Sequence, residues 1–215
     1  MSQSQRPRIE LTGFEARHYD SLLNGLTLGY YPFFLRRVYR DLDIQPGEKI
    51  LDFGAGTGRM AQAMARRAGP AGRVTGLEIG PEMQARFRRR AARQPNLGLL
   101  ARRIEEPLTL EEPADRILIS FVLHGFEQHQ RILIIQNAWE NLQPDGQLCI
   151  LDWNEFELGA KPRWFQKLFQ RVECEAAQDF IVREWPTILA GYRFTGFQTR
   201  EYLRGYVRLI RCRKF

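Results

Sequence analysis

Several features that define common protein classes are scarce or missing in this 215-residue sequence. The cysteines at 149, 174 and 212 are odd in number, lie far apart and form no CxxC or Cys/His spacing, so we expect no disulfide and no bound metal. The longest apolar run, 117–123, is much shorter than the roughly 18 to 20 residues that a membrane-spanning helix requires. The polar first ten residues contain no secretion signal. These absences predict a cytoplasmic protein.

The charge of the sequence is uneven. The formal net charge is +7, and 28 of the 32 basic residues are arginine because only four are lysine. Residues 59–103 carry eleven arginines against two acids, whereas residues 104–157 carry eleven acids against two arginines. We therefore expect one positive side. Such a side suits an anionic membrane, nucleic acid or an acidic substrate, or it is simply solvated.

Strand and helix patterns alternate along most of the chain. A hydrophobic content of 44% is typical of one globular domain, and we expect a single domain over 1–215. Apolar residues at helical spacing between 11 and 43 predict a helical preamble, and we treat 1–45 as preamble and lid. The later segments predict strands at 49–53, 73–78, 97–102, 114–121, 147–153, 196–203 and 206–212, and helices at 59–68, 81–92, 128–142, 164–172 and 175–189. This order predicts a Rossmann-like, doubly wound α/β sheet of seven strands, mostly parallel with an antiparallel last strand.

A glycine-rich loop follows the first predicted strand. In Gly54-Ala55-Gly56-Thr57-Gly58, glycine lets the backbone turn sharply and approach a ligand, and the following helix offers free N–H groups. Arg59 occupies the position at which a dinucleotide loop has glycine, and the lysine of a phosphate-binding P-loop is missing. Asp52 suits an ammonium group better than a pyrophosphate. The loop thus predicts a nucleotide-type ligand with an amino-acid moiety.

Glu78 completes the predicted ligand site. It ends the second predicted strand, twenty residues after Gly58. A carboxylate at that place can accept hydrogen bonds from both hydroxyl groups of a ribose. The ligand should therefore contain an unphosphorylated ribose.

Together with these residues, segments 50–58, 74–83, 117–124 and 142–148 resemble the motifs of class I S-adenosylmethionine-dependent methyltransferases. The resemblance implies S-adenosyl-L-methionine as the cofactor. Arg103 stands where that family has an acid for the adenine amino group, so Glu105, Glu106 or the backbone alone could serve instead. The implied cofactor-binding residues are Tyr19, Asp52, Gly54, Ala55, Gly56, Thr57, Gly58, Glu78, Ile79, Met83, Ile104, Ser120 and Phe121.

Segments 18–24, 28–31 and 205–210 are similar to the ubiquinone/menaquinone biosynthesis C-methyltransferases. The chain lacks much of the long helical segment that this branch carries between its fifth and sixth strands, and His124 replaces an expected arginine. The similarity implies a small or lipid-like acceptor, such as a quinol ring carbon, and peripheral contact with an anionic membrane.

His124 is the candidate catalytic base. It follows the fourth predicted strand, at the sheet edge where ligands bind, and histidine near its ordinary pKa can accept a proton. A packing role is an equal alternative. Trp153, at the end of the fifth predicted strand, is the aromatic residue that we favour at the acceptor site, and the arginine-rich run 86–93 should be surface. Other aromatic residues could be core or pocket: Tyr30, Tyr31, Phe33, Phe34, Trp164 and Phe165.

Two other functions remain open. An RNA or protein methyltransferase would use the basic half, but the chain has no appended nucleic-acid module and no Asn/Asp-Pro-Pro-aromatic signature, so we do not expect nucleic acid as a partner. A non-catalytic protein that only binds the cofactor is the second alternative. The oligomeric state is not predicted.

Overall fold

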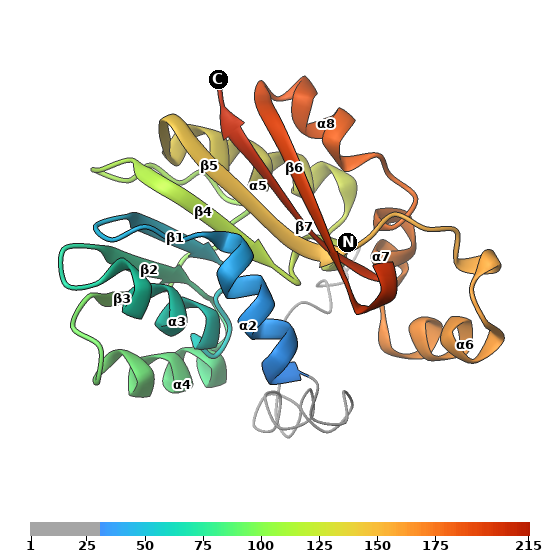
Figure 1. The fold of residues 1–215 in the computed structure, drawn as a ribbon, viewed down its shortest axis with the longest axis horizontal. Helices are drawn as coiled ribbons and strands as arrows, with labels where there is room; N and C mark the ends of the chain where they lie inside the picture. The colour runs from blue at the N-terminus through green and yellow to red at the C-terminus, as the bar shows by residue number, and fades with distance from the viewer. Residues whose placement is uncertain (1–30) are drawn as a thin grey trace, which may run out of the picture.

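The structure, a computed structural model, describes residues 31–215. Its seven strands form one sheet in the order β3-β2-β1-β4-β5-β7-β6 (Figure 1). β1 pairs in parallel with β2 and β4, whereas β7 runs antiparallel to both β5 and β6. The predicted fold class, with its antiparallel last strand, is confirmed. The strands are β1 Lys49–Phe53, β2 Arg73–Leu77, β3 Leu97–Leu100, β4 Ala114–Ser120, β5 Leu142–Trp153, β6 Phe194–Tyr202 and β7 Val207–Lys214.

Helices cover both faces of this sheet (Figure 1). The buried residues of α2, α3 and α4 form one core cluster, and those of α5, α6, α7 and α8 belong to the other. Residues 116–119 of β4 are all buried, as expected for a central strand covered on both faces. The helices are α2 Tyr31–Leu42, α3 Arg59–Ala68, α4 Pro81–Ala91, α5 Gln128–Asn141, α6 Arg163–Val172, α7 Glu175–Phe180 and α8 Trp185–Gly191; the 3-10 turns are η1 Leu123–Gly125, η2 Leu158–Ala160 and η3 Leu203–Gly205.

Two sequence-based boundaries need correction. The single helix predicted over 175–189 is two helices, α7 and α8, separated by residues 181–184. Pro186 lies in the first turn of α8, where its missing N–H costs nothing, but inside a continuous helix it would remove a hydrogen bond and clash with the preceding turn. The strand predicted at 147–153 starts earlier, because β5 begins at Leu142 and pairs irregularly with β4 there.

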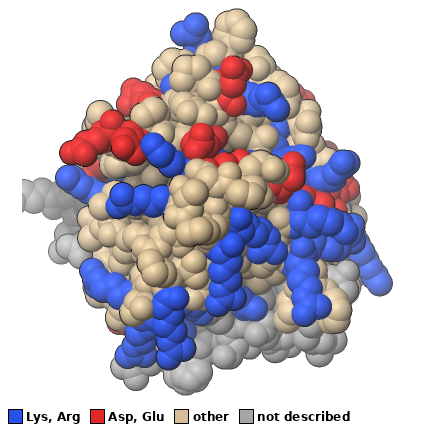
Figure 2. Space-filling model, turned by 60° about the vertical axis from the view of Figure 1, so that its left-hand side comes forward, with Lys and Arg blue, Asp and Glu red and all other residues tan. Residues whose placement is uncertain are grey.

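The predicted charge asymmetry is visible on the surface that carries α3 and α4. Figure 2 shows Lys and Arg side chains across the lower part of this view and Asp and Glu mostly above them. Cys149 and Cys212 are buried thiols and Cys174 is half-buried, and all three are free. No helix among residues 31–215 is long and apolar enough to cross a membrane. Within the proposed preamble and lid, the structure describes α2 but not Tyr19 or Tyr30.

Candidate cofactor and acceptor site

The glycine loop connects β1 to α3 at the carboxyl edge of the sheet. Its three glycines have positive φ, 71° at Gly54, 52° at Gly56 and 78° at Gly58, which side chains rarely allow. A Cβ at Gly54 would lie 2.6 Å from the side chain of Val122, and one at Gly58 would lie 2.5 Å from the ring of Phe87. A Cβ at Gly56 would meet no atom of the described residues within 4 Å. Two glycines therefore serve packing, and the middle one borders open space.

Two neighbouring elements hold the loop in place. The Ala55 amide donates to the Leu77 carbonyl of β2 at 2.9 Å. The guanidinium of Arg90, on α4, donates to the backbone carbonyl of the buried Thr57 at 2.5 Å. The sequence placed Arg90 in a surface run, but this side chain turns inward and is only partly exposed. It fixes the backbone beside Gly56.

Glu78 lies directly after β2 and faces the loop. Its Oε2 accepts a hydrogen bond from the Gly56 amide at 2.8 Å, and its Oε1 accepts from the amides of Ile79 at 2.9 Å and Gly80 at 2.7 Å. A carboxylate has about four acceptor positions, so these bonds orient Glu78 without exhausting it. The predicted ribose-binding carboxylate thus touches the loop at its open glycine.

Asp52, in β1, is buried beneath the loop. Its side chain is 0% exposed, and neither carboxylate oxygen has a hydrogen-bond partner among the described residues. Burial, and secondly the nearby charge of Glu78, raise the pKa of Asp52 to about 8. Buried acids are normally hydrogen-bonded, because an unpaired one is costly. An ammonium group would satisfy this carboxyl, so the residues present fit a ligand with an amino-acid end.

The other predicted cofactor contacts surround the same edge. Ile104 is buried, and its carbonyl accepts a hydrogen bond of 2.7 Å from Asn137, which fixes the segment after β3. Arg103 forms an ion pair of 2.7 Å with Glu105, which therefore already has a cationic partner. Tyr19 lies outside the described residues. Met83 is buried on α4, Ile79 follows Glu78, Ser120 ends β4 and Phe121 follows it with φ 54°.

His124, on η1 after β4, is held between two carboxylates. Its Nδ1 lies 2.7 Å from Asp152 Oδ1, and its Nε2 lies 3.3 Å from Glu173 Oε2. Burial opposes the charged form, but Asp152 and then Glu173 outweigh it and raise the pKa of His124 to about 10. The sequence alone predicts for His124 the pKa of an ordinary histidine, near neutrality. At neutral pH the ring is instead an imidazolium, which has no free nitrogen to accept a proton.

Sequence reasoning missed these two acids as functional residues. Asp152 could have been found, because it is the next-to-last residue of β5, as Asp52 is of β1, and both strands end at the same edge of the sheet. Glu173 carries no comparable signal, since it simply follows α6 and meets His124 only through the packing of that region.

Aromatic side chains form a cluster beside His124 and β5. Trp153 is half-buried and its ring centroid lies 5.3 Å from that of Phe169 on α6; its indole N–H has no partner among the described residues. Phe165, one of the predicted pocket candidates, packs against Trp153 and is itself buried. Of the other aromatic residues predicted as core or pocket, Phe34 lies in the core, and Phe33 and Trp164 are exposed. Tyr30 and the side chain of Tyr31 lie outside the described part of the structure.

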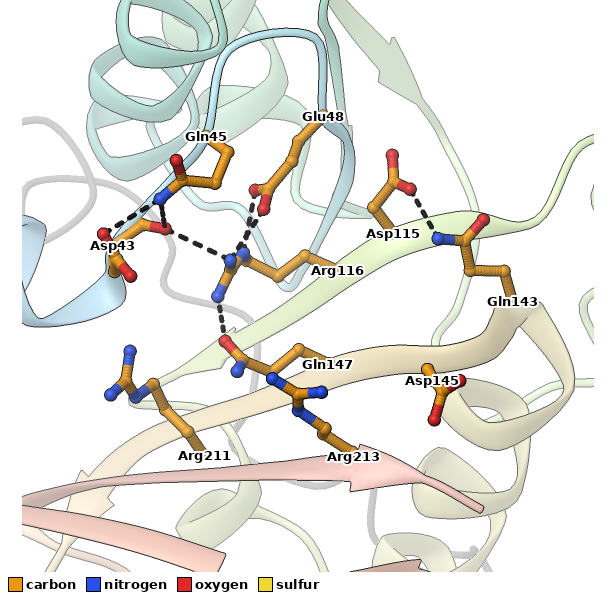
Figure 3. A pocket seen from close by; sticks show the side chains of 10 residues that line it. All are labelled: Asp43, Gln45, Glu48, Asp115, Arg116, Gln143, Asp145, Gln147, Arg211 and Arg213. Carbon is orange, nitrogen blue, oxygen red and sulfur yellow. Dashed lines mark hydrogen bonds and ion pairs between the residues drawn. The ribbon is translucent and has the colours of Figure 1, made fainter. Parts of the chain in front are cut away.

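A separate polar cavity of about 380 Å³ lies at the opposite, amino edge of β4 and β5. Arg116 donates to Glu48 at 2.8 Å and also reaches Gln147, and Gln143 donates to Asp115 at 2.7 Å (Figure 3). None of the predicted site residues lines it. Much of its polar lining is internally paired and fastens strands together, so the candidate site remains the carboxyl edge.

Comparisons with known proteins agree with this geometry. Residues 50–146 match the family described as methyltransferase domain. A stretch of 143 residues is 28% identical to the ubiquinone/menaquinone biosynthesis C-methyltransferase UbiE of Hydrogenovibrio crunogenus, covering 65% of this chain and 56% of that protein. The chain therefore matches little more than half the length of this curated relative.

Two solved structures share the fold. A SAM-dependent methyltransferase from Aquifex aeolicus superposes with a TM-score of 0.63 at 18% identity, covering 84% of this chain and 89% of that one. The N-methyltransferase NodS from Bradyrhizobium japonicum WM9, crystallised with S-adenosyl-L-homocysteine, superposes with a TM-score of 0.53 at 18% identity, covering 78% of each chain.

The matched domain contains the glycine loop, Glu78 and the edge of β4. Residues 50–146 thus match a methyltransferase domain, and the sheet has the fold of SAM-dependent methyltransferases of known structure. S-adenosyl-L-methionine is accordingly the cofactor that the loop, Glu78 and Asp52 fit.

Proposed function

We propose that the protein transfers a methyl group from S-adenosylmethionine to a small or lipid-like acceptor that carries a phenolic ring, of the quinol type. The observation that carries the cofactor part is the buried Asp52 carboxyl, which has no hydrogen-bond partner among residues 31–215, beneath the loop in which the Gly56 amide donates to Glu78. When bound, the cofactor supplies an activated sulfonium methyl group, so the protein needs mainly to orient the acceptor and exclude water.

Each part of the cradle would hold one part of the cofactor. Asp52 would bind the ammonium group and Glu78 the ribose hydroxyls, while Gly56 allows the close backbone approach. Ile104 and its neighbouring backbone would border the adenine. The remaining positions of the predicted set, Ala55, Thr57, Ile79, Met83, Ser120 and Phe121, would line the same ligand, and Tyr19 would close over it from the preamble.

The acceptor chemistry follows from the charge state of His124. Its pKa of about 10 makes it a hydrogen-bond donor and a positive charge rather than a base at neutral pH. Glu173, only partly exposed and 3.3 Å from His124, would take the phenolic proton, and the imidazolium would stabilise the resulting phenolate oxygen. Phenolate charge is shared with the ring, so a ring carbon becomes nucleophilic.

The name of the UbiE relative supports a quinol-like acceptor, and the structure offers a compatible surface. The half-buried Trp153 and the aromatic rings of α6 lie at the edge of the sheet that also carries His124. The indole N–H of Trp153 is buried and has no partner among the described residues, so it would donate to a polar group of an acceptor that packs against this ring. An aromatic wall with one donor suits a flat ring that carries oxygen substituents.

A labelling experiment tests this function. The protein is incubated with S-adenosylmethionine labelled in its methyl group and with cell extract, and the label is then partitioned among organic, nucleic-acid and protein fractions. Label in the organic fraction supports the proposal, and label in RNA or protein supports the corresponding methyltransferase instead. Cofactor binding without transfer to any fraction would favour a non-catalytic protein.

A further inference from the structure

Helix α6 presents an exposed face that combines basic and apolar side chains. Arg163, Lys167 and Arg171 follow one another at a spacing of four residues and are all exposed. Trp164 is 65% exposed and Leu168 46%, although large apolar side chains usually avoid such exposure. Because residues four apart lie on the same side of a helix, these five side chains form one continuous face.

The opposite face of α6 anchors the helix to the protein. Phe165 and Phe169 are buried and pack against Trp153 at the end of β5. The exposed Trp164 and Leu168 are therefore not needed to attach α6 to the core. Figure 1 shows α6 at the periphery of the molecule, beyond the carboxyl ends of β4 and β5.

The charge of this face selects its partner. Residues 158–172 contain four basic residues and no acid. Tryptophan is enriched at membrane interfaces, and each basic residue near an anionic surface contributes a favourable attraction. An apolar and a cationic group together provide the two signals that reversible membrane attachment requires.

The arginine-rich surface of α3 and α4 offers only one of these signals. Arg88, Arg89 and Arg93 are exposed there, but none of the large exposed apolar side chains of the described part of the chain lies between residues 59 and 103. Charge alone would attract an anionic surface without inserting into it. α6 therefore fits a lipid surface better than α4 does.

We infer that α6 docks the protein on anionic phospholipid membranes, with Trp164 and Leu168 entering the headgroup region and Arg163, Lys167 and Arg171 binding the phosphates. The residue that follows α6, Glu173, contacts His124, so docking would bring the acceptor site to the membrane surface. The inference goes beyond the proposed methyl transfer and does not depend on it.

Vesicle sedimentation tests the charged part of the face. We expect the protein to sediment with vesicles of phosphatidylglycerol and phosphatidylcholine at low salt, and not with phosphatidylcholine alone. The triple variant R163Q/K167Q/R171Q should bind about a hundredfold more weakly, at roughly fivefold for each residue. The matched control R88Q/R89Q/R93Q removes the same charge from α4 and the turn that follows it, and it should bind far more tightly than the α6 variant. Equal losses in the two variants would overturn the inference.

Tryptophan accessibility tests the apolar part. The other tryptophans, 139, 153 and 185, are half-buried or buried, so quenching by acrylamide should report mainly Trp164. Anionic vesicles should protect it, and W164F should lose the protected signal. Protection without vesicles, together with a concentration-dependent mass, would assign the face to self-association instead. Calorimetry with S-adenosylhomocysteine checks that each variant keeps its cofactor site; normal binding and methylation without vesicle binding would refute this inference alone.

Discussion

The buried Asp52 carboxyl beneath the glycine loop should couple cofactor binding to proton release. With a pKa of about 8, Asp52 is protonated in roughly nine of ten free molecules at pH 7. An ammonium group placed against it favours the carboxylate, so binding expels that proton. The conservative variant Asp52→Asn keeps the shape of the side chain and removes its titration.

The size of the effect follows from the pKa. Below pH 8, each further unit of acidity makes the carboxylate about tenfold rarer, so affinity should rise about tenfold from pH 6 to pH 7. His124 does not interfere, since its pKa of about 10 keeps it charged throughout this range. The ligand's own amino group, with an ordinary pKa of roughly 7.7 to 8.0, also stays mostly charged.

Isothermal calorimetry with S-adenosylhomocysteine measures both quantities. In buffers of different ionisation enthalpy at pH 7, the wild type should release roughly 0.9 proton per ligand bound. Asp52→Asn should bind more weakly at pH 7 and lose both the proton release and the slope. Asp145→Asn, an acid at the opposite edge of the sheet, is the matched control and should behave as wild type.

The same carboxyl should also affect stability. Because the pKa is higher in the folded than in the unfolded protein, the folded state binds more protons between about pH 4 and pH 8, and the free energy of unfolding should fall as pH rises through that window. In Asp52→Asn this fall should be smaller. A wild-type affinity that is flat from pH 6 to pH 7, or a slope that survives in Asp52→Asn, would refute the assignment of the ammonium group to Asp52.

Three further substitutions test the rest of the site. Glu78→Ala should weaken S-adenosylhomocysteine binding by about 1.5 to 3 kcal/mol in calorimetry, because hydrogen bonds to a charged group are lost, and an unchanged affinity would remove Glu78 from the ribose site. His124→Gln should lower turnover in the labelling assay but leave that affinity alone. A wild-type rate at saturating cofactor, where the titration of Asp52 no longer matters, that rises steeply between pH 6 and pH 8 and loses this rise in His124→Gln would contradict the pKa of about 10. Gly58→Ala should lower the unfolding free energy by about 1 to 3 kcal/mol in denaturant titration, because its Cβ would strike Phe87, whereas wild-type stability would show that the ring can move.

The sheet and the cofactor edge were accessible to sequence analysis for a physical reason. Apolar runs bounded by glycine and proline are typical of buried parallel strands, and the carboxyl ends of such strands share one edge. The residues just after β1, β2 and β4, among them Gly56, Glu78 and His124, therefore had to lie near one another. The glycine loop then indicated which kind of ligand binds at that edge.

What sequence analysis could not reach depends on contacts between distant segments. In the sequence, Arg90 is indistinguishable from the other arginines of a basic helix. It contacts the carbonyl of Thr57 only because α4 packs next to the glycine loop in the folded protein. The charge state of His124 depends in the same way on Glu173, 49 residues further along the chain. A residue type and its neighbours in sequence predict an ordinary pKa, whereas the fold sets the actual one.

Arg131 shows how the surroundings of His124 are assembled. This α5 side chain is 0% exposed, although arginine is rarely buried. It donates to the carbonyl of Leu123 at 3.0 Å, on the turn that carries His124, and to the carbonyl of Ala176 at 2.5 Å, on the helix that follows Glu173. Its ion pair of 2.6 Å with Asp179 compensates the buried charge. Arg131 therefore ties the turn that carries His124 to the helix that follows Glu173, in addition to the contacts of His124 with Asp152 and Glu173 themselves.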